Sequence, residues 1–161
     1  MKLMDMTIPG SLNKSFDGRQ VSPQLVLDLL NHAVWAPNHK LRQPWRFLYI
    51  PSGEKPEGLA PEMHAHLVVT LPIDHNRSRY DENLAAVFCL IQNMKLLGEE
   101  RGLSVDVTFQ EWMYKRAHCR RLGIPDHDNV AAVLDLAYYT NTTEAEAVPK
   151  IPTALNLSRL S

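Results

Sequence analysis

Residues 34–50 have the sequence VWAPNHKLRQPWRFLYI, in which three kinds of local structure are expected. Pro37 disfavours the α conformation for the residue before it, so a helix is predicted to end at Ala36. A polar loop follows, and Pro44 then favours an extended entry into residues 45–50, whose aromatic and apolar composition is typical of a β-strand. A polar loop held by prolines between a helix and a strand can position a ligand on a rigid frame. An ordinary helix-to-strand connection fits the same residues.

The composition is that of an ordinary globular chain. The 161 residues are 45% hydrophobic and 22% charged with a formal net charge of -1, which favours one domain over residues 1–161. The near-neutral net charge provides no excess of positive charge for binding nucleic acid or an anionic membrane, so neither is expected as a partner. No apolar run approaches the roughly 20 residues of a membrane span, and no signal-peptide pattern is found. Cys89 and Cys119 make no disulfide framework, so a cytoplasmic location is expected.

The pattern along the rest of the chain predicts alternating helices and strands. Ser22 and Pro23 indicate the start of a helix. Residues 84–97 are apolar nearly all round, which indicates a helix that is buried in the domain or in a helical interface. Ser78 or Asp81 is expected to cap the start of this helix. Strands are predicted over residues 66–73, 104–109 and 130–139, and a short helix over residues 111–122. Residues 1–21 form an N-terminal segment, and residues 140–161 a C-terminal arm.

Two motifs at fixed spacing carry a resemblance to a known family. Ala36-Pro37-Asn38-His39 followed by Gln43-Pro44-Trp45-Arg46-Phe47 resembles the flavin-dependent nitroreductases, and most of all a small subgroup with Ala-Pro-(Asn or Asp)-His and then Gln-Pro-Trp. The Gln92-Asn93 pair and the Leu122-Gly123-Ile124-Pro125 turn are similar to the family as well. The resemblance implies an α+β fold, with a mainly antiparallel sheet of about four core strands flanked by helices and a C-terminal arm. It also implies a homodimer centred on residues 84–97, which their apolar character independently favours.

The resemblance further implies a cofactor and a reaction. FMN would be bound between the subunits, and NAD(P)H would give a hydride to it in a ping-pong reaction that reduces a nitroaromatic, quinone or similar small acceptor. Six residues are expected to contact FMN, and these are Lys14 and Lys150 at its phosphate and Pro37, Asn38, His39 and Gln43 in the loop. No catalytic side chain is predicted. His64 and His66 have the spacing of a metal pair, but no third ligand accompanies them, so no metal is expected.

Three departures from the family pattern keep other functions open. Gly10, Ser11 and Leu12 stand where the family has two basic residues and a serine, residues 51–61 replace a longer segment, and Trp112 comes later than the family's tryptophan. One alternative is a specialised flavin oxidase or dehydrogenase. Another is a flavin-free descendant that acts as a binding or structural subunit. The lost basic pair also suggests the hypothesis that Lys40 or Arg42 supplies a cation to the phosphate.

Overall fold

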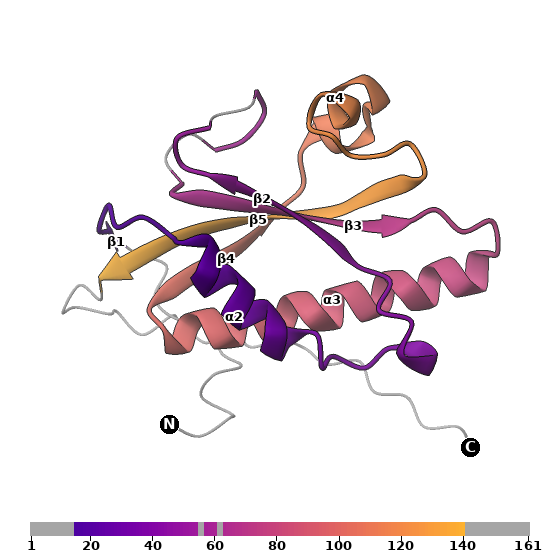
Figure 1. Ribbon diagram of the computed structural model, residues 1–161, viewed down its shortest axis with the longest axis horizontal. Coiled ribbons are helices and arrows are strands. Elements are labelled where there is room, and N and C mark those ends of the chain that lie inside the picture. Colours follow the sequence, from indigo (N-terminus) through magenta and orange to yellow (C-terminus); the bar gives the residue numbers. More distant parts are fainter. Residues whose placement is uncertain (1–14, 55–56, 61–62, 141–161) are drawn as a thin grey trace, which may run out of the picture.

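An antiparallel sheet forms the centre of the protein (Figure 1). The structure, a computed structural model, describes residues 15–54, 57–60 and 63–140. The strands are β1 (Ser15–Phe16), β2 (Arg46–Pro51), β3 (Ala65–Pro72), β4 (Leu103–Thr108) and β5 (Asp128–Thr140). Their order is β1-β5-β3-β2, and β4 also pairs with β5. Every pairing is antiparallel, which confirms the predicted fold class.

Two long helices cover one face of this sheet, below it in Figure 1. The first, α2 (Pro23–Ala33), begins as predicted, because the Ser22 hydroxyl accepts a hydrogen bond from the Leu25 amide and proline occupies the first turn. It ends at Ala33 rather than at the predicted Ala36. Residues 34–36 continue as a turn, in which the Ala36 amide donates to the Ala33 carbonyl at 3.1 Å.

The second helix, α3 (Arg77–Glu100), begins earlier than predicted. Its cap is Asn76, whose side chain accepts from the Arg79 amide, and neither Ser78 nor Asp81 has that role. One stripe of α3 is buried against the sheet and α2, and the opposite side is exposed, with Ala85, Phe88, Cys89 and Gln92 on it. Of the two predicted alternatives, complete burial within the domain does not hold for the single chain, and the helical interface stays a prediction. Within the part of the chain that is described, no helix combines the length and the apolar composition needed to cross a membrane.

The other face of the sheet is covered by two short helical pieces, with α4 above the sheet in Figure 1. The helix predicted over residues 111–122 is divided into η2 (Glu111–Tyr114) and α4 (Arg116–Arg121), because Lys115 between them has an extended conformation. Each face thus has its own apolar core. The core under α2 and α3 includes Leu67, Val69, Leu90, Met94 and Leu134. The core under η2 and α4 is smaller and includes Ile50, Val68, Trp112, Cys119 and Val133.

Candidate functional site

The predicted ligand loop connects α2 to β2 and contains a single helical turn, η1 (His39–Leu41), which lies close to α3. Ala36 before the loop and Pro44 and Trp45 after it are buried. Between these ends the side chains of residues 39–43 are exposed. The loop is therefore fixed at both ends and open to a ligand in its middle.

Asn38 holds the loop in shape. Its side-chain amide nitrogen donates to the Ala36 carbonyl, and its side-chain oxygen accepts from the Gln43 amide, both at 3.1 Å. These bonds close a loop in which three non-glycine residues have positive φ angles, Lys40 at 52°, Leu41 at 52° and Gln43 at 46°. Such conformations are unfavourable for L-residues and persist where surrounding contacts impose them, often at ligand sites. Asn38 has one N–H and one lone pair left for a ligand, so its contact with flavin stays a prediction.

Replacing Asn38 with alanine is expected to loosen this loop. The two lost hydrogen bonds should lower the free energy of unfolding by about 1–2 kcal/mol in urea denaturation. Trypsin should also cleave faster after the exposed Lys40 or Arg42. Asn38→Asp keeps an acceptor for the Gln43 amide and should recover part of the effect. A cleavage rate that is the same in Asn38→Ala and the wild type would contradict this role.

The six predicted FMN contacts are only partly placed. Pro37, Asn38, His39 and Gln43 lie together on the one loop, and all except the half-buried Asn38 are exposed. Lys14 and Lys150 lie outside the described residues. Lys40 and Arg42 are exposed on the same loop, so either could reach an anionic group there. Residues 34–45 contain Lys40 and Arg42 and no carboxylate, which gives the loop a positive local charge.

A network that sequence reasoning missed attaches the loop to the sheet. The Arg46 guanidinium lies 2.7 Å from a carboxylate oxygen of Asp128, whose side chain is completely buried. The other oxygen of Asp128 accepts from the Thr70 hydroxyl at 3.1 Å, and Arg116 donates to the Asp128 carbonyl at 2.5 Å. The start of β2, the end of β3 and the start of β5 are thereby joined. No sequence signal links Arg46 to a partner 82 positions away.

His66 is part of a buried pair. Its Nδ1 lies 2.7 Å from Oδ1 of Asp135, across the β3–β5 ladder, and both side chains are about 95% buried. Asp106 on β4 is the register partner of Asp135 on the other side, and its carboxylate accepts from the Ser104 hydroxyl. No group of three or more metal-ligating side chains occurs in residues 15–54, 57–60 and 63–140.

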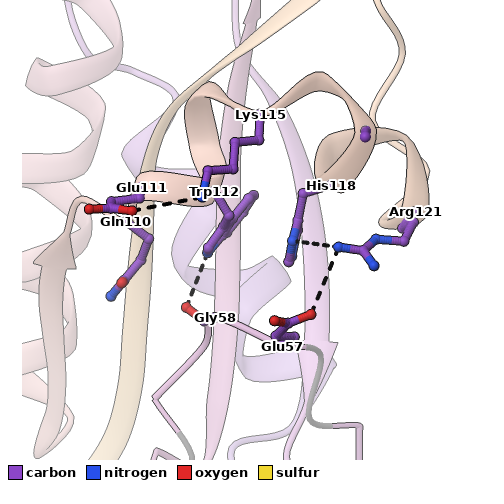
Figure 2. A pocket seen from close by; sticks show the side chains of 9 residues that line it. Glu57, Gly58, Gln110, Glu111, Trp112, Lys115, His118 and Arg121 are labelled. Carbon is purple, nitrogen blue, oxygen red and sulfur yellow. Dashed lines mark hydrogen bonds and ion pairs between the residues drawn. The ribbon is translucent and has the colours of Figure 1, made fainter.

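A cavity of about 450 Å³ lies on the face of the sheet opposite the loop, between η2, α4 and the segment 57–58. Figure 2 shows its lining, which consists of Glu57, Gly58, Gln110, Glu111, Trp112, Lys115, Ala117, His118 and Arg121. The Trp112 and His118 rings stack with their centroids 5.0 Å apart. Trp112 Nε1 donates to the Gly58 carbonyl at 3.1 Å. Gly58 has a φ of 93°, and a Cβ there would lie 2.4 Å from the Trp112 ring, so only glycine fits this contact.

The comparisons agree on one family. Residues 13–71, which include the loop and β2, match the model described as the nitroreductase family. YfhC of Bacillus subtilis strain 168, named as a candidate NAD(P)H nitroreductase, is 25% identical over 83% of this chain and 82% of its own length. A crystal structure of a nitroreductase-like family protein from Bacillus cereus matches with a TM-score of 0.78 and 22% identity, over 91% of this chain and 90% of that one.

The chain has a nitroreductase-like fold. The match over residues 13–71 confirms the resemblance that residues 36–47 indicated. A further crystal structure of the same fold, of a nitroreductase candidate from Desulfovibrio desulfuricans, was solved in complex with FMN. Its TM-score is 0.71 at 15% identity, over 96% of this chain and 97% of that chain. The nitroreductase-like architecture extends well beyond residue 71, where the family match ends, and includes α3, β4 and β5.

Proposed function

We propose that the protein is an FMN-dependent oxidoreductase that transfers a hydride from NAD(P)H, through the flavin, to a small acceptor such as a nitroaromatic or a quinone. The observation that carries the proposal is the loop of residues 37–43. Two hydrogen bonds of the Asn38 side chain hold its shape, its other side chains are exposed, and it contains no carboxylate. The family match that includes this loop, and the FMN complex of the Desulfovibrio relative, support it.

The side chains present fit a flavin. A flavin ring offers carbonyl oxygens and ring nitrogens, and Gln43, His39 and the remaining N–H of Asn38 are suitable partners for them. Lys40 and Arg42 suit the negative charge of its phosphate. Trp35 and Leu41, which are 83% and 76% exposed, provide apolar surface beside these polar groups. FMN would supply the hydride chemistry. The chain's own residues would orient the ring and limit access of water to it.

We also propose that two copies pair through α3. Ala85, Phe88, Cys89 and Gln92 are exposed on one side of this helix, although three of the four are apolar. Phe88 stacks on Phe109, which is also exposed, so the apolar surface continues from α3 to the end of β4. Contiguous apolar surface of this kind is typical of an interface. Covering it with a second copy would place two loops of residues 37–43 in one assembly.

The flavin proposal is tested by the absorption spectrum of the purified protein, recorded before and after excess FMN and desalting. Retention of about one flavin per chain is expected, followed by NADH or NADPH oxidation with a quinone acceptor. Lys40→Ala and Arg42→Ala should weaken FMN binding if either side chain contacts the phosphate. Arg77→Ala removes an exposed cation on α3 and serves as the control. A protein that remains colourless after FMN treatment would overturn the proposal and favour the flavin-free alternative.

The α3 interface gives a prediction about thiol reactivity. Cys89 is exposed in the single chain, whereas Cys119 is buried and burial raises the pKa of its thiol. One thiol per chain should therefore react with a thiol-specific reagent in dilute solution, and Cys89→Ser should abolish the reaction. The rate should fall as the protein concentration rises and the dimer protects Cys89. A rate independent of concentration, in a protein that is dimeric by sedimentation, would place the interface elsewhere.

A further inference from the structure

The loop of residues 37–43 is followed closely by Arg46, the first residue of β2. Arg46 is near enough in the chain to set where the loop ends, although its side chain pairs with Asp128 at the start of β5. We propose that Arg46 and Asp128 are positioning residues for the flavin site, because their ion pair holds the loop in the shape that binds FMN. The inference rests on the proposed function and adds to it two residues that act through the loop.

Two side chains anchor the chain directly after the loop. Trp45 is 7% exposed and belongs to the core under α2 and α3. Successive side chains of an extended segment point to opposite faces, so Arg46 points away from that core and reaches the buried Asp128. Pro44 has a fixed φ angle and adds little freedom between these anchors and Gln43. The end of the loop can therefore move only if one of the two anchors is released.

The Arg46 anchor is rigid because its partner is itself held. One oxygen of the completely buried Asp128 carboxylate lies 2.7 Å from Arg46 Nη1, and the other accepts from the Thr70 hydroxyl at 3.1 Å. Nε2 of His127 lies 3.2 Å from the same Nη1, and it accepts, because a guanidinium can only donate. A carboxylate buried in this way is strongly destabilised when its cation is lost. The Arg46 guanidinium is thus confined by two neighbours.

The loop needs such an anchor because its backbone is strained. Lys40, Leu41 and Gln43 have positive φ angles, which are unfavourable for residues other than glycine and persist where surrounding contacts impose them. Asn38 accepts from the Gln43 amide, but this bond lasts only while Gln43 stays in place. Release of Arg46 lets the backbone relax and lowers the fraction of molecules with a binding-competent loop. The apparent FMN affinity falls in proportion to that fraction.

A double variant separates positioning from folding stability. In Arg46→Ala with Asp128→Asn, the buried amide carries no charge, so the urea midpoint should stay close to that of the wild type although the anchor is lost. Titration followed by flavin fluorescence should show about tenfold weaker FMN binding, which corresponds to a competent loop in about a tenth of the molecules. Arg46→Lys keeps a cation beside Asp128 and should recover most of the affinity.

Arg120→Ala is the matched control. Arg120 pairs with Asp126 at 2.7 and 2.8 Å, but both side chains are more than half exposed, and neither residue belongs to β2 or to the loop. This variant should bind FMN as the wild type does. A double variant that keeps the wild-type urea midpoint and binds FMN within about twofold of the wild type would overturn the proposal.

Hydrogen exchange of the unliganded protein tests the positioning without FMN. The Gln43 amide, which donates to Asn38 Oδ1, should exchange about tenfold faster in the double variant. The Val34 amide, which donates to the Leu30 carbonyl at the end of α2, should keep its rate and so exclude global unfolding. Unchanged exchange at Gln43 would overturn the positioning role even in a protein that binds FMN. Faster exchange at Gln43 in a protein that never binds FMN would support the positioning of the loop and overturn the proposed function.

Discussion

Replacing His66 with alanine is expected to lower the free energy of unfolding by about 3–5 kcal/mol. Asp135 would then keep a buried carboxyl group without the partner that lies 2.7 Å from it. Asp106, the register partner of Asp135 on the next strand, is also a carboxylate and cannot replace the imidazole as a donor. The variant should therefore unfold at a much lower urea concentration, measured by circular dichroism.

His66→Gln provides the matched comparison for this prediction. The glutamine amide can donate to Asp135, so part of the lost stability should return. The double variant His66→Ala and Asp135→Ala should be more stable than the sum of the two single effects predicts, because it removes the unpaired carboxyl group. Strictly additive effects would mean that the two side chains do not stabilise each other.

Replacing Arg46 with alanine is expected to cost about 3 kcal/mol. The carboxylate of Asp128 would remain completely buried, with Thr70 as its remaining side-chain donor at hydrogen-bond distance among the described residues. Arg46 directly follows Trp45 at the end of the ligand loop. The same change should therefore make the first residues of β2 more mobile. Urea denaturation measures the first effect, and hydrogen exchange of the Phe47 to Ile50 amides measures the second.

Arg79→Ala is the control for the Arg46 prediction. Arg79 lies 3.4 Å from Asp74 with its side chain half exposed, so its loss should cost less than about 1 kcal/mol. Asp128→Asn in the Arg46→Ala background should restore stability, since the amide no longer buries a charge. Equal losses for Arg46→Ala and Arg79→Ala would show that the burial of Asp128 does not strengthen its pair.

The strands could be predicted from the sequence because their patterns are local. Residues 66–73, 104–109 and 130–139 were expected, and β3, β4 and β5 include nearly all of them with shifts of one or two residues at the ends. The errors lie where two local signals compete. Asn76 caps α3 before Ser78 can do so, and the extended Lys115 divides the helix predicted over residues 111–122. Pro37 restricts only the residue before it, so a turn could separate it from the end of α2 at Ala33.

The candidate site was predictable only in part, for a related physical reason. The loop of Pro37, Asn38, His39 and Gln43 is continuous in sequence, so its residues necessarily lie together. The partners of Arg46, His66 and Trp112 are Asp128, Asp135 and Gly58, and each lies at least 54 positions away. These contacts depend on the register of the strands and on the packing of η2. Neither can be deduced from the spacing of residues along the sequence. The cavity beside Trp112 and His118 escaped sequence reasoning for the same reason.

The position of β5 has a consequence for the synthesis of the protein. This strand pairs with β1, β3 and β4, yet it follows all of them in the chain. On the ribosome, β2 and β3 can form a hairpin early, but β4 has no strand partner among the described elements until residues 128–140 have emerged. The core residues of β3 that pack beside β5 are only partly covered during this interval, which exposes the nascent chain to aggregation. The sheet can therefore be completed only after the last described strand has been made.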